Sequence, residues 1–173
     1  MALAPVITGP RLRLRPFVRA DIGPAYLSWL NDPERMKFSR QRERRHDEAS
    51  SVSYLDSFEG TPHYFWAVEE KGSGRLVGTM TAYFEGADAD VGILIGRPGQ
   101  GLGSEAWGLA LDHLLRVERR ARARAGTADG HAAMRRLCER WGMGLLAEAP
   151  PGFVRYEVAR EAWRGLPPSA VSR

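Results

Sequence analysis

Four glycines lie close together near the middle of this chain, between an apolar stretch and a segment that favours a helix. They are Gly96, Gly99, Gly101 and Gly103. Glycine adopts positive φ without strain, so a loop of this kind can turn several backbone N–H groups toward one point. The first turn of the following helix adds N–H groups without intrahelical partners and the positive end of the helix dipole. The spacing therefore predicts a site for a phosphate or pyrophosphate.

Two familiar phosphate-binding loops do not match this stretch. The Lys-Ser/Thr pair of a P-loop is missing, so hydrolysis of a magnesium-bound nucleotide is not expected. The spacing Gly99-x-Gly101-x-Gly103 also differs from the G-x-G-x-x-G of dinucleotide-binding folds. The ligand is therefore expected to carry phosphates that are held by another type of loop.

The elements around the glycines indicate how they are positioned. Residues 63–69, 75–84 and 89–95 read as three strands, separated by turns at 71–74 and 86–88, which is typical of an antiparallel meander. A helix is expected from Ser104 to about residue 119, followed by a strand at 122–127. Strand, glycine loop, helix and strand together predict a βαβ unit with a right-handed crossover.

The flanking segments predict a further set of elements. Residues 11–17 alternate charged and apolar side chains, as an edge strand does. Asp21 is expected to cap a helix at 23–30, Asp47 a helix ending near residue 58, and Asp129 a helix at 131–141. A last strand is expected at 153–160. We expect one domain over residues 1–173, with about 1–10 and 166–173 flexible.

Composition excludes several classes of protein. The chain of 173 residues has 43% hydrophobic residues and no apolar run long enough to span a membrane. Its single cysteine, Cys138, rules out an internal disulfide, and its four histidines show no metal-ligand spacing. The N-terminus does not resemble a signal peptide, so a cytoplasmic protein without a metal is expected.

The net charge of +4 and the pI of about 9.6 raise the alternative of nucleic-acid binding. The arginines alternate with acidic residues, however, and no nucleic-acid-binding motif is present, so a surface that attracts an anionic cofactor is favoured. The arginine-rich segment 38–46 has two interpretations. It is either a solvated face or a loop that contacts the substrate.

The glycine stretch resembles the acetyl-CoA pyrophosphate loop of the GNAT acetyltransferases, whose pattern is Q/R-x-x-G-x-G/A. Pro98 stands at the Q/R position here, and Arg97 is expected to supply the charge. The order of elements is similar to the GNAT fold over most of the chain. Within that superfamily the chain resembles the branch that includes ribosomal-protein N-terminal acetyltransferases and amino-sugar acetyltransferases, through stretches such as Arg11-Leu-Arg-Leu-Arg-Pro, Trp29-Leu-Asn-Asp-Pro33 and Trp141-Gly-Met143. This resemblance implies an α/β (α+β) fold, with a mixed central sheet, an antiparallel N-terminal meander and a βαβ CoA-binding core.

The resemblance also implies where acetyl-CoA binds. The strand before the loop and the strand after the crossover helix splay apart in this fold, and the pantetheine arm pairs with the first of them. Backbone groups of Leu94 and Ile95 would make that pairing. His131 stands where the family usually has Asn and would contact the pantetheine or phosphate region. The residues implied around the pyrophosphate are Arg97, Gly99, Gln100, Gly101, Leu102, Gly103 and Ser104.

Transfer of an acetyl group from a thioester to an amine requires a base for the amine and an acid for the leaving thiolate. Cys138 stands where many GNAT enzymes carry a tyrosine as that acid; its alternative role is a small buried hydrophobe. Asp90 is the favoured base, acting directly or through a water, with Glu85 as the second candidate. Asp90 could equally be an exposed charge at the end of a strand.

The function expected from these residues is acetyl-CoA-dependent N-acetylation of a primary amine by direct attack on the thioester. The amine belongs to a small molecule such as a nucleotide-linked amino sugar, whose diphosphate Arg40 and Arg42 would bind, or to a protein N-terminus. The alternative is a CoA-binding module of the same fold without turnover. The partners expected are acetyl-CoA and an amine, with a homodimer left open, and neither nucleic acid nor membrane.

Overall fold

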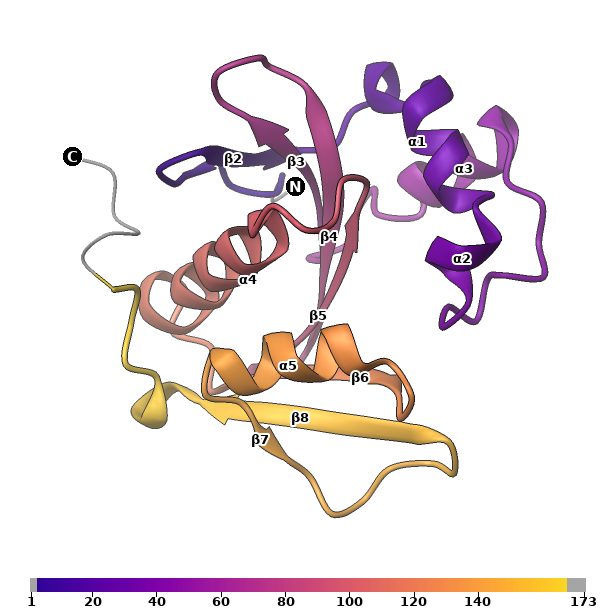
Figure 1. The fold of residues 1–173 in the computed structure, drawn as a ribbon. Coiled ribbons are helices and arrows are strands. Elements are labelled where there is room, and N and C mark those ends of the chain that lie inside the picture. Colours follow the sequence, from indigo (N-terminus) through magenta and orange to yellow (C-terminus); the bar gives the residue numbers. More distant parts are fainter. Residues whose placement is uncertain (1–2, 168–173) are drawn as a thin grey trace.

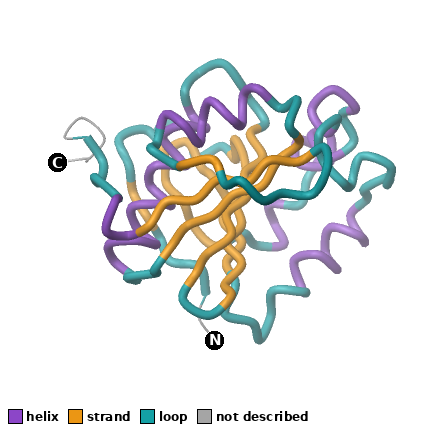
Figure 2. Tube along the Cα trace, turned by 90° about the horizontal axis from the view of Figure 1, so that it is seen from below, coloured by secondary structure: helices purple, strands orange, loops and turns teal. Residues whose placement is uncertain are grey.

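The computed structural model describes residues 3–167, which form a mixed eight-stranded sheet covered by helices on both faces (Figures 1 and 2). The strand order is β1-β2-β3-β4-β5-β6-β8-β7. The strands are β1 (Ile7–Thr8), β2 (Leu12–Pro16), β3 (Tyr64–Glu70), β4 (Leu76–Glu85), β5 (Asp88–Ile95), β6 (Arg122–Ala128), β7 (Gly144–Leu145) and β8 (Phe153–Ala159). The α-helices are α1 (Pro24–Leu30), α2 (Pro33–Met36), α3 (Glu48–Asp56), α4 (Leu102–Asp112) and α5 (Ala132–Arg140). Short 3₁₀ turns lie at Arg19–Asp21 and Arg160–Ala162.

The predicted meander and βαβ unit are confirmed. Strands β3, β4 and β5 pair antiparallel in sequence, with Trp66 opposite Met80 and Met80 opposite Ile93. Helix α4 then leads to β6, which pairs parallel with β5. The expected helix at 104–119 begins two residues earlier, and its last part, His113–Val117, is a π-helical turn.

The N-terminal edge of the sheet differs from the expectation. Within the segment expected to be flexible, residues 3–10 pack on the sheet: Ala4 is buried, β1 pairs with β2, and Trp66 Nε1 donates to the carbonyl of Pro5 at 2.9 Å. The segment expected as an edge strand therefore lies one position inside the sheet. At the other end Leu166 packs against the core. Positions 1–2 and 168–173 of the expected flexible ends lie outside the described residues.

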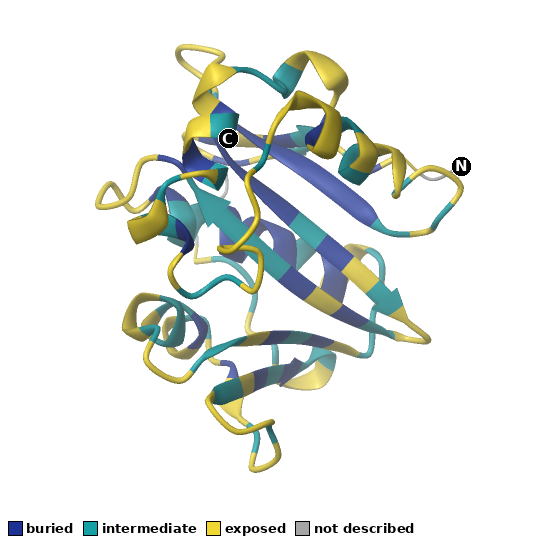
Figure 3. Cartoon of the chain, turned by 90° about the vertical axis from the view of Figure 1, so that its right-hand side faces the viewer, coloured by how far each residue is buried: buried dark blue, intermediate teal, exposed yellow. Residues whose placement is uncertain are grey.

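Alternation along the strands divides the core into two layers. Trp66, Met80 and Val91 face α4 and α5, whereas Phe65 and Leu94 face α1 and α3. Buried residues gather on the strands and exposed ones in the loops (Figure 3). Among the described residues no helix is long and apolar enough to cross a membrane.

The helix caps were predicted correctly in one of three cases. Asp47 accepts from the Ser50 amide and caps α3 as expected. Asp21 does not cap α1, because its carboxylate is held by Arg15 and the Val18 amide, and Gly23 takes the N-cap position. His131, rather than Asp129, is the N-cap residue of α5.

Candidate active site

Strands β5 and β6 stay together for only part of their length. Their parallel pairing covers Asp88–Asp90 and Arg122–Arg124, after which the strands separate. The carbonyl of Ala87 accepts from Ala121, and the Gly96 amide donates to Val77 on the other side. Along β5 the backbone N–H and C=O groups of successive residues point alternately toward β4 and away from it. Because the Gly96 amide points toward β4, the backbone groups of residues 91, 93 and 95 point toward the gap. This half of the strand can accept an extra extended segment.

The two backbone positions expected to pair with pantetheine are therefore not equivalent. Leu94 pairs with Thr79, and its carbonyl oxygen points at Gly78 of β4, so its backbone groups face away from the gap. Ile95 does face the gap, but its carbonyl accepts from Arg35 Nη1 at 2.8 Å. The same nitrogen donates to the Gly96 carbonyl at 2.7 Å. The expectation for Leu94 is corrected by the strand register, and Arg35 is a neighbour that the sequence did not indicate.

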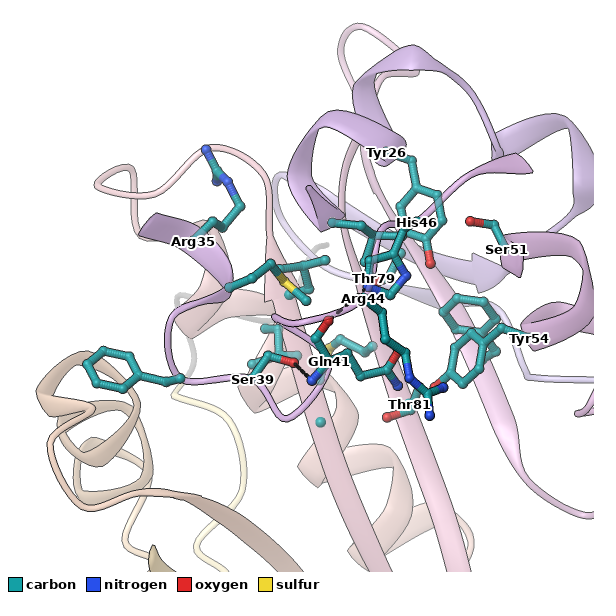
Figure 4. A pocket seen from close by; sticks show the side chains of 18 of the residues that line it. Tyr26, Arg35, Ser39, Gln41, Arg44, His46, Ser51, Tyr54, Thr79 and Thr81 are labelled. Atoms are coloured by element: carbon teal, nitrogen blue, oxygen red, sulfur yellow. Dashed lines mark hydrogen bonds between the residues drawn. The ribbon is translucent and has the colours of Figure 1, made fainter. Parts of the chain in front are cut away.

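A cavity of about 830 Å³ lies over this gap. Residues 91–94 of β5 form its floor with Thr79–Thr81 of β4, and Gly126, Thr127 and His131 close the side toward α5. The segment 37–46 after α2, which we call the roof loop, covers it from the direction of α1 and α3 (Figure 4). The cavity thus joins the gap between the strands to the space beneath the helices.

The glycine loop has the geometry that the anion site requires. Gly99 and Gly101 have φ values of +87° and +71°, and Gly101 is the N-cap of α4. A Cβ on Gly96 would overlap the Trp29 ring, and one on Gly103 would touch Ile95 at 3.3 Å. Arg97 and Gln100 lie in the loop itself, whereas Leu102 and Ser104 begin α4, where Leu102 is buried and the Ser104 hydroxyl accepts from Trp141 Nε1. The loop therefore has the positive-φ glycines and the helix N-terminus that the predicted anion site requires.

A clamp between β2 and α4 holds this loop, and sequence reasoning missed it. Glu105, in the first turn of α4, accepts from the amides of Arg11 and Leu12 and from Arg11 Nε, at 2.8, 3.0 and 2.8 Å. Arg11 Nη1 donates to the Gln100 carbonyl at 2.9 Å. The guanidinium thus pairs with the Glu105 carboxylate in the first turn of α4 and holds one carbonyl of the glycine loop.

His131 lies where α5 begins and lines the cavity. Its Nδ1 is 2.9 Å from Thr127 Oγ1, and its ring stacks on Phe38 of the roof loop with centroids 4.5 Å apart. Burial, together with the nearby Lys37 charge, lowers the pKa of the imidazole, so the ring is neutral at pH 7. A neutral histidine can donate or accept one hydrogen bond here, as the expected contact with pantetheine requires.

The two candidate bases share one face of the sheet. Asp90 lies opposite Tyr83, and Glu85 lies opposite Asp88 at the adjoining hairpin. Asp90 is open to solvent, yet protein atoms crowd it closely enough that desolvation raises the pKa of its carboxyl. Arg155 and Arg124 oppose that rise, and Glu85 adds to it. Asp90 follows directly on the cavity floor without being part of its lining, so a water would have to connect it with an amine there.

Cys138 is far less suited to proton transfer than the sequence allowed. Its side chain is completely buried in the core cluster beneath α4 and is absent from the cavity lining. Burial, followed by the charge of Glu139, raises the pKa of the thiol to about 12. Such a thiol is a poor donor to a thiolate whose own conjugate acid has a pKa of about 8.5. Of the two roles considered, the structure favours the buried hydrophobe.

The replacement Cys138→Ala is accordingly expected to leave kcat and acetyl-CoA affinity unchanged. It should lower the free energy of unfolding by about 1 kcal/mol, because a small buried side chain leaves a cavity behind. Steady-state kinetics and urea unfolding measure the two effects on one preparation. A fall in kcat of about tenfold or more at unchanged acetyl-CoA affinity would restore Cys138 as a general acid.

The arginines of the roof loop line two different hollows, the main cavity and a smaller one outside it. Arg40 lies over the Phe153 ring, with its guanidinium carbon 4.7 Å from the centroid, and Arg42 donates to the Lys37 carbonyl. Both line a smaller outer hollow of about 370 Å³, not the main cavity. Arg44 and Arg45 line the main cavity instead. Of the arginines in this loop, the two expected to bind the substrate, Arg40 and Arg42, therefore lie outside the main cavity, because the fold decides which way each side chain turns.

Comparison with known proteins agrees with this geometry. Residues 11–144 match the family model of the acetyltransferase (GNAT) domain. No curated protein sequence matches the chain.

Solved structures share the fold at low sequence identity. A GNAT-family acetyltransferase from Bacillus anthracis superposes with a TM-score of 0.77 at 21% identity, over 90% of this chain and 99% of that chain. An acetyltransferase from Agrobacterium tumefaciens str. C58 gives 0.74 at 20%, over 90% and 94%. RimJ of Mycobacterium smegmatis, in complex with CoA-disulfide, gives 0.74 at 17%, over 91% and 88%.

The splayed strands, the glycine loop at the start of α4 and the family match over most of the chain all lead to one assignment. This chain belongs to the GNAT acetyltransferases and is an N-acetyltransferase that uses acetyl-CoA as co-substrate.

Proposed function

We propose that the protein acetylates the primary amine of a small molecule that carries an anionic group, by direct attack of the amine on the thioester. The observation that carries this proposal is the charge of the cavity. Arg44, Arg45 and His46 line it, and none of its lining residues is an aspartate or glutamate. Within residues 3–167 neither Arg44 nor Arg45 forms an ion pair, so both charges are available to a ligand.

A small molecule is favoured over a protein N-terminus by the roof loop. Phe38 stacks on His131, and Arg40 packs on Phe153, so the loop reaches across to α5 and β8. A cavity covered in this way encloses a small acceptor but restricts an extended peptide. Amino sugars, free or linked to a nucleotide, are the members of this class that we would test first.

The residues around the cavity supply a base and a contact for the acceptor, while the CoA thiolate is expelled as the amide forms and takes its proton from solvent. Acetyl-CoA, when bound, provides the thioester carbonyl that the amine attacks. A protonated amine has no free electron pair, so its proton must leave first, and Asp90 accepts it through a water. Arg44 holds the anionic group of the acceptor, which fixes the position of the amine before it reacts.

Exchange of Arg44 for glutamine tests this assignment. We expect the KM for a phosphorylated amine to rise about 10- to 100-fold with little change in kcat, because a remote contact contributes equally to ground and transition states. The KM for a neutral amine should not change. Initial rates of CoA thiol release, with mass-spectrometric detection of the acetylated amine, provide the measurement.

Arg42→Gln is the matched control, since Arg42 lies on the same loop but lines the outer hollow. If Arg44→Gln and Arg42→Gln change the KM equally, the anionic group is not bound in the main cavity. If acetyl-CoA binds and no amine of a broad panel is acetylated, the alternative of a CoA-binding module without turnover replaces the proposal.

A further inference from the structure

The end of the cavity beneath α1 and α3 contains a buried hydroxyl group that the fold itself does not use. Ser51 is only 4% exposed and lines the cavity, yet its Oγ forms no hydrogen bond within the described residues. A serine inside a helix either points to solvent or bonds to a carbonyl of the preceding turn. Two others of the same segment form such a bond, since Ser50 Oγ donates to the Asp47 carbonyl and Ser57 Oγ to that of Tyr54. Ser53 of the same helix also lacks such a bond among the described residues, but it is exposed, whereas the buried hydroxyl of Ser51 is turned toward the cavity interior (Figure 4).

Two further residues that carry a hydroxyl group and are themselves mostly buried line the same cavity from other elements. Tyr26 of α1 is 4% exposed and Thr79 of β4 is 6% exposed. Burial raises the pKa of the Tyr26 phenol to about 12, so the group remains a hydrogen-bond donor at neutral pH. Buried polar groups without a partner are unfavourable for folding, and they persist in proteins where a function requires them.

The strand register fixes where these hydroxyl groups lie relative to Asp90, the candidate base. Asp90 lies opposite Tyr83, Gly92 opposite Thr81, and Leu94 opposite Thr79. Arg44 reaches toward Thr81 and Tyr54 (Figure 4). Along β4 and β5 the order is therefore the candidate base, the arginine, and then the hydroxyl groups, with about 7 Å between the levels of Thr81 and Thr79.

We infer that Ser51, Tyr26 and Thr79 form a subsite for the hydroxyl groups of the acceptor, which makes the preferred acceptor an amino sugar that carries a phosphate or carboxylate. This inference rests on the proposed function, because it concerns the same cavity. A serine hydroxyl both donates and accepts, as does a sugar hydroxyl, and pairing the two satisfies a group that is otherwise buried without a partner. A site built in this way discriminates against analogues that lack the hydroxyl.

The test uses the enzyme loaded with CoA rather than acetyl-CoA, so that amines bind without being acetylated. Calorimetry compares glucosamine 6-phosphate with 2-aminoethyl phosphate, which has the same amine and phosphate but no hydroxyl groups. The wild type should bind the amino sugar at least about tenfold more tightly. Ser51→Ala should weaken binding of the amino sugar about 3- to 10-fold and leave 2-aminoethyl phosphate unchanged.

Thermal unfolding separates this role from a structural one. Removal of an unpaired buried hydroxyl should leave the Tm of Ser51→Ala equal to or above that of the wild type. Ser28→Ala, on the exposed side of α1, is the control and should change neither affinity. Equal binding of the two phosphates by the wild type, equal losses in Ser51→Ala, or tighter binding of a short peptide amine would overturn the inference. If the amino sugar binds as expected but acetyl-CoA yields no product, the proposed function fails and the subsite stands.

Discussion

Replacement of Gly101 by aspartate is expected to remove most acetyl-CoA binding while the fold persists. Gly101 adopts φ +71° at the N-cap of α4, in the centre of the glycine loop. Aspartate adopts such a conformation at a cost of about 1 kcal/mol, which most domains of this size tolerate. Its carboxylate would repel a pyrophosphate at the loop, and we expect the Kd to rise at least about 100-fold, or about 2.7 kcal/mol. Isothermal calorimetry with acetyl-CoA measures the change.

Gly74→Asp provides a matched control for this experiment. Gly74 has φ +68°, and a Cβ there would meet no atom within 4 Å, but it lies in the hairpin between β3 and β4. The same backbone strain and the same added charge are thus introduced away from the loop. Equal acetyl-CoA affinity in the two variants would show that the pyrophosphate does not bind at Gly101.

Replacement of Asp90 by asparagine is expected to lower kcat/KM about 10²- to 10⁴-fold, which is the range of a positioned general base. The amide preserves the shape of the side chain but cannot accept a proton. Raising the pH should recover part of the loss, because free amine accumulates without the base. Asp88→Asn is the control, since Asp88 lies on the same strand but is paired with Arg122 and Arg124. Wild-type rates for Asp90→Asn across the pH range would instead favour Glu85 or a water alone.

The raised pKa of Asp90 fixes the sign of two pH effects. The base works only when ionised, so the acidic limb of kcat/KM should lie above the ordinary aspartate value of 3.8. Desolvation disfavours the ionised form in the folded state, so Asp90 reduces stability as pH rises from 3.8 through its raised pKa. At pH 7 the free energy of unfolding of Asp90→Asn should therefore equal or exceed that of the wild type.

Local patterns account for the parts of the fold that could be predicted. The meander follows from alternation and turn residues, and the loop from glycines with positive φ at Gly99 and Gly101. The cap at Asp47 lies three residues before its partner, so the sequence contains the whole interaction. Asp21 does not cap α1 because Arg15 of β2 binds its carboxylate.

The parts of the site that could not be predicted depend on distant contacts. Arg11 and Glu105 are 94 positions apart, and nothing in either neighbourhood indicates that they meet. Arg44 points into the main cavity and Arg42 into the outer hollow because the roof loop crosses to α5. That crossing depends on the stacking of Phe38 on His131, which are far apart in the sequence. Cys138 had two roles in the sequence because a helix position alone does not reveal which face is buried.

The short pairing between β5 and β6 has a consequence for the energetics of the whole molecule. Among the described residues, the ladder between the two halves of the sheet contains only three residue pairs, with one more backbone bond from Ala121 to Ala87 beside it. A ligand that lies along the unpaired part of β5 supplies main-chain hydrogen bonds that the chain lacks, so part of its binding free energy appears as folding free energy. By mass action this linkage contributes about 2.7 kcal/mol at a concentration 100 times the Kd. The cell's acetyl-CoA level would then set how long the enzyme survives proteolysis as well as how fast it works.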